Sequence, residues 1–425
     1  MEKGRLRFFV LMMLVLVLGS SASSGDKHQS WRKAAASTSP MLLNEAGPSI
    51  VFQLHGNVYP IGYYNVTINV GRPSKPYFLD VDTGSELTWL QCDAPCVHCI
   101  KAPHPFYRPT KNLVPCNDPL CAALNPSGHR CDSPEQCDYK VEYADGGSSI
   151  GVLLRDVFLF NLTNGKRISP LLSLGCGYYQ DPGRSNHLLD GILGLGRGKA
   201  SIISQLHSQG LVRNVIGHCI SRRGGGFLFF GDDLYDSSDV SWASMSHHLP
   251  KHYSPGFADL TFGGKPTEIR KMLIAFDSGS SYTYFRSEAY HVLVSLVKRE
   301  LSGKPLRQVE AMEDQTLPLC WKGRRPFKSI SDVKKYFKPL ALNFTYNREA
   351  KTQFHIPPEA FLIISSKGNV CLGILNGTQV ELGRLNIIGD ISMQDRMVIY
   401  NNEKQKIGWS PANCDRLPKP KRTII

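Results

Sequence analysis

Asp82-Thr83-Gly84-Ser85 has a near copy later in the chain, Asp277-Ser278-Gly279-Ser280. Each copy follows a run rich in apolar residues, with Phe78, Leu79 and Val81 before the first and LIAF at 273–276 before the second. Each aspartate is therefore expected where a buried strand breaks into a tight turn. Two carboxylates that meet can share one proton, because like charges in contact cannot both ionise. The repeat therefore predicts a pair of acids that supplies a general base and a general acid.

A second repeat supports an organisation in two lobes. Residues 190–196 read DGILGLG and residues 386–390 read NIIGD, and Ile192 lies as far after the first aspartate as Ile387 lies after the second. Each lobe is thus expected to pack an apolar strand against its own Asp turn. The glycine-rich run 191–199 lacks the Ser or Thr of a phosphate-binding loop, so that interpretation fails.

Composition favours a large, mostly β protein. The chain has 425 residues, 42% of them hydrophobic, and its 38 Gly and 27 Pro are typical of a turn-rich fold rather than a doubly wound α/β fold. Alternating apolar residues predict strands such as 64–70, whereas helical spacing predicts one clear helix from Ser287 to Leu301 and a shorter one over 201–210. The net charge of +13 is scattered, so we expect no nucleic-acid partner.

The N-terminal residues predict entry into the secretory pathway. Basic residues precede an apolar run and then small residues, so residues 1–24 are expected to be a signal peptide and residues 25–55 a short propeptide or leader. No later run is long enough for a membrane anchor. We expect a secreted protein of the extracellular space or cell wall, with the vacuole as the alternative. Four sequons predict glycosylation, at Asn65, Asn161, Asn343 and Asn376.

Twelve cysteines in a secreted chain predict six disulfides, and seven of them fall in the insertion 92–137. Because seven is odd, at least one of these pairs outside the insertion or stays free, and the connectivity stays open. The spacing of Cys96 and Cys99 also allows a zinc site, but an oxidising compartment favours disulfides, so we expect no metal. The cysteines are Cys92, Cys96, Cys99, Cys116, Cys121, Cys131, Cys137, Cys176, Cys219, Cys320, Cys371 and Cys414.

These motifs together resemble the pepsin-like aspartic proteases over about residues 56–415. The cysteine-rich insertion, LGCG at 174–177 and PANC at 411–414 resemble the plant nepenthesin and nucellin branch, including the nucellin-like enzymes of cereals such as rice. The resemblance implies a bilobal, mostly β fold with two six-stranded-type lobes, at 56–240 and 241–415, a cleft between them and a basic tail at 416–425. It also implies a monomeric zymogen that hydrolyses polypeptides at acidic pH without a cofactor.

The resemblance assigns roles to residues of both turns. Asp82 and Asp277 would activate a water molecule without a covalent intermediate, and Gly84 and Gly279 would permit the close approach of the turns. Thr83 and Ser278 would lock the turns together, while Ser85 and Ser280 would hydrogen-bond the outer carboxylate oxygens.

A flap over the cleft is implied at about residues 139–153. Tyr143 would be its tyrosine, hydrogen-bonded by Trp89, and Asp145 and Gly146 would form its tip. Ala144 replaces the glycine that usually follows this tyrosine, and Gly147 is an extra or exchanged residue.

The alternative is binding without hydrolysis. Some plant proteins of this fold inhibit xylan-degrading enzymes and lack an intact catalytic pair. Because this sequence keeps Asp82, Asp277 and the Gly and Ser residues that follow them, it favours the enzyme.

Overall fold

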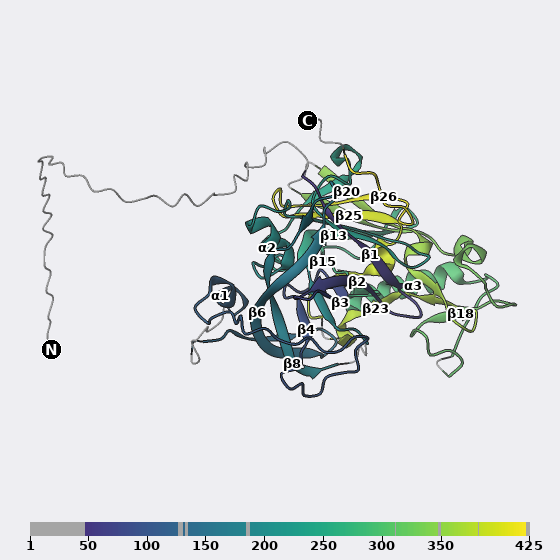
Figure 1. Ribbon diagram of the computed structural model, residues 1–425. Coiled ribbons are helices and arrows are strands. Elements are labelled where there is room, and N and C mark those ends of the chain that lie inside the picture. Colours follow the sequence, from purple (N-terminus) through teal and green to yellow (C-terminus); the bar gives the residue numbers. More distant parts are fainter. Residues whose placement is uncertain are drawn as a thin grey trace, which may run out of the picture. The chain divides into compact units, whose positions relative to one another are not determined.

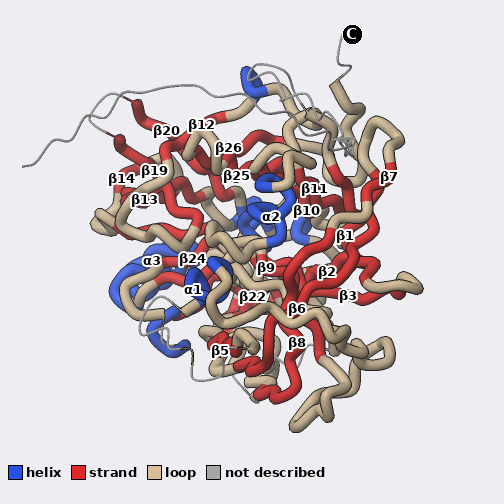
Figure 2. Tube along the Cα trace, turned by 60° about the vertical axis from the view of Figure 1, so that its left-hand side comes forward, coloured by secondary structure: helices blue, strands red, loops and turns tan. Residues whose placement is uncertain are grey.

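The computed structural model describes residues 47–125, 131, 135–183, 188–310, 312–346, 350–380 and 382–421. The expected signal peptide, most of the expected leader and the last four residues of the basic tail lie outside the described residues. The described part is mostly strand with few helices, which confirms the predicted fold class; Figure 2 draws the strands in red and the helices in blue.

Strands alternate with short turns through the first half of the chain. Its helices are α1 (Pro119–Leu124) and α2 (Ile202–Ser208). Its strands are β1 (Ile50–Asn57), β2 (Tyr63–Val70), β3 (Lys75–Asp82), β4 (Trp89–Gln91), β5 (Asp138–Glu142), β6 (Ser148–Asn161), β7 (Arg167–Ile168), β8 (Leu171–Asp181), β9 (Gly191–Gly194), β10 (Val215–Ile220), β11 (Gly226–Phe230) and β12 (Ser241–Ser244).

The second half contains the longest described helix, α3 (Ser287–Leu301), where helical spacing predicts it, and the short α4 (Asp390–Met393). Its strands are β13 (Tyr253–Phe262), β14 (Lys265–Pro266), β15 (Met272–Phe276), β16 (Thr283–Phe285), β17 (Arg307–Gln308), β18 (Cys320–Lys322), β19 (Leu340–Tyr346), β20 (Ala350–Ile356), β21 (Leu362–Ile364), β22 (Val370–Leu372), β23 (Ile374–Asn376), β24 (Asn386–Ile388), β25 (Arg396–Asn401) and β26 (Lys406–Pro411).

One sheet joins strands from both ends of the chain. Its order is β12-β26-β25-β10-β11-β1-β2-β3-β9-β4-β8-β6-β5, with β7 beside β6. The C-terminal β25 enters it by antiparallel pairing with β10, and β26 pairs with β25. These two strands are the yellow ones in Figure 1, whereas β1 of the same sheet is purple.

The second half builds its own sheet, in the order β20-β19-β13-β15-β24-β16-β23 with β14 beside β13, and a smaller sheet, β17-β18-β22-β21. The two halves repeat one arrangement at their Asp turns. β3 pairs in parallel with β9, and β15 pairs in parallel with β24. The repeated DGILGLG and NIIGD motifs therefore supply the strand that lies beside each Asp-bearing strand.

The fold begins earlier than the boundary expected at residue 56. β1 starts at Ile50 and pairs with β11, and the side chains of Ile50, Phe52 and Leu54 are buried. Apolar residues alternate with half-buried or exposed ones over residues 50–55, which is the pattern of a strand. These residues therefore belong to the fold rather than to the expected leader.

Buried apolar residues of both halves form one large core. It reaches from Ile50 to Trp409 and includes Phe276 and Tyr253, so the two lobes share packed side chains. Burial of this kind is the main favourable contribution to folding. None of the described helices is both long and apolar enough to cross a membrane.

All twelve cysteines are paired, as six disulfides. Within the insertion 92–137, three bridges are local, and the odd cysteine, Cys92, pairs outside it with Cys176. The other five bridges are Cys96–Cys99, Cys116–Cys131, Cys121–Cys137, Cys219–Cys414 and Cys320–Cys371. The sulfurs considered for zinc are therefore bonded to each other rather than available as thiolates.

Candidate active site

Each aspartate of the repeat stands at the C-terminal end of its buried strand. Asp82 ends β3 and its carbonyl accepts a hydrogen bond from the N–H of Leu195 at 2.7 Å. Asp277 follows β15 and its N–H donates to the carbonyl of Ile388 at 3.1 Å. The neighbouring parallel strand thus fixes the backbone of each aspartate.

The two carboxylates accept the same pair of hydrogen bonds. The Gly84 N–H donates to Asp82 Oδ1 at 2.7 Å, and the Gly279 N–H donates to Asp277 Oδ1 at 2.9 Å. Ser85 donates its hydroxyl to Asp82 Oδ2, as Ser280 does to Asp277 Oδ2 at 3.1 Å. One oxygen of each acid is therefore oriented by backbone and the other by a hydroxyl.

Thr83 and Ser278 connect the two turns reciprocally. The Ser278 N–H donates to Thr83 Oγ1 at 2.9 Å, and the Thr83 N–H donates to Ser278 Oγ at 3.2 Å. The Ser278 hydroxyl donates to the Val81 carbonyl at 2.7 Å and the Thr83 hydroxyl to the Phe276 carbonyl at 3.5 Å. Because both side chains are buried, this network holds two distant segments in one fixed relation.

The two glycines let each turn approach the opposite acid. A Cβ atom on Gly84 would lie 2.7 Å from Asp277 Oδ1, and one on Gly279 would lie 2.5 Å from Asp82 Oδ1. Both separations are shorter than a side-chain carbon permits. The absence of a Cβ here allows Asp82 and Asp277 to face each other.

A hairpin formed by β5 and β6 lies over this pair. At its tip the Gly146 N–H donates to the Tyr143 carbonyl at 3.0 Å, and Asp145 Oδ1 accepts from the Gly147 N–H at 2.8 Å. Gly146 has φ = 88°, a conformation that favours glycine. Trp89 Nε1 donates to the Tyr143 hydroxyl at 2.7 Å, so the hairpin is tied to the strand that follows the first Asp turn.

The acids and the hairpin line one cleft of about 580 Å³. Both lobes contribute to it, with Ser85 and Gln91 from one half and Tyr284 and Ile387 from the other. Its lining includes Asp80, Asp82, Gly84, Trp89, Glu142, Tyr143, Asp145, Gln180, Asp181, Ile192, His252, Asp277, Gly279, Ser280, Tyr282, Leu382 and Leu385.

Comparison with known proteins identifies the family. Residues 64–232 match the family described as "Xylanase inhibitor N-terminal", and residues 258–411 match "Xylanase inhibitor C-terminal". A rice protein (Oryza sativa subsp. indica) that is named as an aspartic proteinase is 46% identical over 400 residues, which cover 90% of this chain and 96% of its own. The chain belongs to the pepsin-like aspartic proteinase family.

The comparisons also find more distant relatives and solved structures of the same fold. The Nepenthes gracilis protein named "Aspartic proteinase nepenthesin-1" is 26% identical over 376 residues, which cover 83% of this chain and 78% of its own. Among solved structures, the aspartic proteinase from Irpex lacteus aligns with a TM-score of 0.60 and 17% identity, over 88% of this chain and 100% of its own. Basic 7S globulin from soybean aligns with a TM-score of 0.66 and 14% identity, over 87% and 98%. At these identities the structures show the fold alone.

Burial and charge change the proton affinity of the aspartic proteinase site. Burial first, and the neighbouring Asp277 second, raise the pKa of Asp82 well above its usual value. Burial and the Asp82 carboxylate also raise the pKa of Tyr143 well above its usual value, so its hydroxyl keeps its proton. The arrangement therefore retains one proton on the acid pair and a hydroxyl donor beside it.

Sequence reasoning missed two further acids beside the pair. Asp390 is 1% exposed, and within the described residues neither of its carboxylate oxygens has a hydrogen-bond partner. Burial, then the charges of Asp80, Asp277 and Asp82, raise its pKa well above the ordinary value. Two signals were present in the sequence, since Asp390 ends the NIIGD motif and Asp80 lies two residues before Asp82, on the same face of β3.

The four expected glycosylation sites differ in accessibility. Asn161 is exposed at the end of β6. The other three are half-buried, and their side-chain amides donate to the His55 carbonyl (Asn65, 3.3 Å), the Asp259 carbonyl (Asn343, 3.2 Å) and Ser287 Oγ (Asn376, 3.4 Å). Glycosylation stays a prediction at all four, and Asn161 is the most accessible acceptor.

Proposed function

We propose that this protein is an aspartic endopeptidase that hydrolyses polypeptides at acidic pH. The observation that carries the proposal is the matched pair of Asp turns, in which Asp82 and Asp277 accept equivalent hydrogen bonds and each faces the glycine of the other turn. Such symmetry serves a reaction that needs an acid and a base of the same chemical type at one point.

The proposed reaction begins with a water molecule held between the two carboxylates. The ionised member takes a proton from this water as its oxygen attacks the scissile carbonyl carbon. The protonated member donates its proton to the carbonyl oxygen, which gives a gem-diol without a covalent intermediate. The shared proton belongs to the pair as a unit. Tyr143 and Trp89 would close the flap over the bound peptide.

The pH dependence follows from the one-proton requirement. Activity is expected to rise as the pair loses its first proton, and to fall at higher pH where the pair loses the second, which burial and the charge of the other carboxylate make harder to remove. The maximum is therefore expected on the acid side of neutrality.

The proposed setting is an oxidising compartment, because six disulfides persist only where thiols are not kept reduced. We place the protein outside the cell or in the cell wall, with the vacuole as the alternative, and propose that it acts as a monomer released from a zymogen.

Casein digestion from about pH 3 to 7 tests the proposal, with wild type, Asp82→Asn and Asp277→Asn. Removal of a positioned acid or base is expected to lower the rate about 100-fold or more in each variant. Unchanged melting temperatures would show that the variants fold. Equal cleavage by either variant would overturn the mechanism. A folded but inactive wild type, after acid treatment, would favour a binding protein of the kind that inhibits xylan-degrading enzymes.

A further inference from the structure

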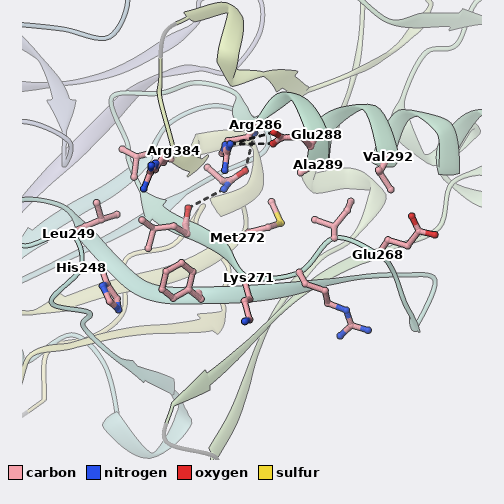
Figure 3. Close-up of a pocket in the computed structure, with 16 residues that line it drawn as sticks. His248, Leu249, Glu268, Lys271, Met272, Arg286, Glu288, Ala289, Val292 and Arg384 are labelled. Carbon is pink, nitrogen blue, oxygen red and sulfur yellow. Dashed lines mark hydrogen bonds and ion pairs between the residues drawn. The ribbon is translucent and has the colours of Figure 1, made fainter.

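A second groove lies beside the cleft, on the C-terminal half of the fold. It has a volume of about 630 Å³ and lies between β13 and β15 on one side and the first turns of α3 on the other (Figure 3). Its lining is largely apolar, with contributions from Leu249, Phe257, Met272 and Val292. Phe257 is 43% exposed and gives the groove an accessible apolar surface.

Positive charge dominates the rim of this groove. Arg286 pairs with Glu288 at 3.3 Å and Arg270 pairs with Asp259 at 3.0 Å, so these two arginines are compensated. Lys271 and Arg384 are exposed, and neither has an ion-pair partner within the described part of the chain. Figure 3 shows Arg384 and Arg286 toward one end of the groove and Glu268 toward the other.

The groove and the cleft are neighbours that share wall residues. Leu385 lines both cavities. Leu249 lines the groove and His252 lines the cleft, and the two residues belong to one turn in which the His252 N–H donates to the Leu249 carbonyl at 3.2 Å. Leu385 and this turn therefore lie at the boundary between the cleft and the groove.

The two cavities have opposite charge. Among the described residues that line the cleft, His252 is the one basic side chain. The acidic side chains are Asp82 and Asp277 together with Asp80, Glu142, Asp145 and Asp181. Acidic residues of a bound polypeptide are thus repelled from the cleft and attracted to the unpaired cations of the groove.

We propose that the groove is a second substrate-binding site, which takes an acidic segment of the polypeptide being cleaved. Its carboxylates pair with Arg384 and Lys271, and its apolar side chains contact Phe257 and Val292. This inference rests on the proposed endopeptidase function, and it names the preferred substrate as a chain with acidic residues several positions from the scissile bond.

Matched peptides test the proposal. A peptide from a casein site that the protein cleaves is extended by a Glu-rich tail or by a Gln-rich tail, through spacers of about four and about eight residues, which reach roughly 14 and 28 Å when extended. For the wild type, the acidic tail is expected to lower KM about fivefold relative to the neutral tail at one spacer length, as two exposed ion pairs allow, and salt is expected to reduce this ratio. In the double variant Arg384→Glu, Lys271→Glu the ratio of the two KM values is expected to fall to about one.

Arg324→Glu is the control, since Arg324 is exposed and lines neither cavity. Equal KM values for the two tails in the wild type, or an equal loss in the Arg324→Glu control, would overturn the proposal. Fluorescence anisotropy of the labelled Glu-tailed peptide, compared with the Gln-tailed peptide, on the full-length Asp82→Asn protein separates the two proposals, with tighter binding of the Glu-tailed peptide as the sign of the groove. Tighter binding that the double variant abolishes supports the groove even if no peptide is cleaved. Equal binding of the two peptides despite cleavage rejects the groove and leaves the endopeptidase intact.

Discussion

Thr83 and Ser278 show how two small side chains fix a site made from distant parts of a chain. Each hydroxyl both accepts from the opposite backbone N–H and donates to a backbone carbonyl. Neither side chain lines the cleft, although the residues on either side of each one do. Their contribution is therefore to position the acids.

Replacing Thr83 by Val tests this positioning. Val has nearly the same shape, but the buried Ser278 N–H loses its acceptor, which is expected to lower the free energy of unfolding by about 1–3 kcal/mol. Urea denaturation measures this change. Thr83→Ser keeps the hydroxyl and is the matched control, so an equal loss in both variants would contradict the role assigned to the hydrogen bond.

Asp390 gives a prediction about stability and pH. Its folded-state pKa is raised by burial and by Asp80, Asp277 and Asp82, so folding takes up a proton. The stabilisation is fully present below the unfolded pKa of about 3.9 and is lost as the pH rises toward the folded pKa. Asp390→Asn cannot ionise, and its melting temperature is expected to fall less between about pH 4.5 and 7.5 than that of the wild type. The exposed Asp239→Asn is the control, and equal pH slopes for Asp390→Asn and wild type would refute the prediction.

The hydrogen bond from the Trp89 indole to the Tyr143 hydroxyl ties the hairpin of β5 and β6 to β4. Trp89→Phe removes this donor and is expected to lower kcat/KM by about 2- to 10-fold, the range of one net hydrogen bond. Trp242→Phe provides a matched control, because that indole N–H donates to the Ser237 carbonyl away from the cleft. An unchanged kcat/KM in Trp89→Phe would show that the flap does not need the bond.

Helices and turns that depend on the spacing of nearby residues could be predicted from the sequence. α3 runs over Ser287–Leu301 as helical spacing indicates, and the Asp turns follow β3 and β15 as the apolar runs indicate. The bond from Trp89 to Tyr143 came from the family resemblance. Contacts between residues far apart in the sequence were not predicted. Examples are the pairing of β10 with β25 and the disulfide between Cys92 and Cys176. The cationic groove escaped for the same reason, because its residues come from separate segments that only the fold brings together.

The shared sheet predicts that the C-terminal strands are essential to the whole fold. β25 covers the edge of β10, and Cys219 of β10 is bonded to Cys414 at a sequence separation of 195. A chain that ends before Arg396 would expose this edge and lose the bridge, which removes about 2–5 kcal/mol by itself. We expect it to aggregate or lack near-ultraviolet circular dichroism, whereas removal of residues 416–425 leaves both the spectrum and the activity intact. A well-folded chain ending before Arg396 would contradict the assigned role of β25.

The reciprocal bonds between the Asp turns also determine when, during synthesis, the candidate active site is assembled. During synthesis, a ribosome releases the first aspartate long before the second, and the strand that closes the joint sheet emerges almost last. A nascent chain therefore lacks the paired Asp turns while its second half is still being made. The candidate active site is assembled only when synthesis of the C-terminal strands is complete.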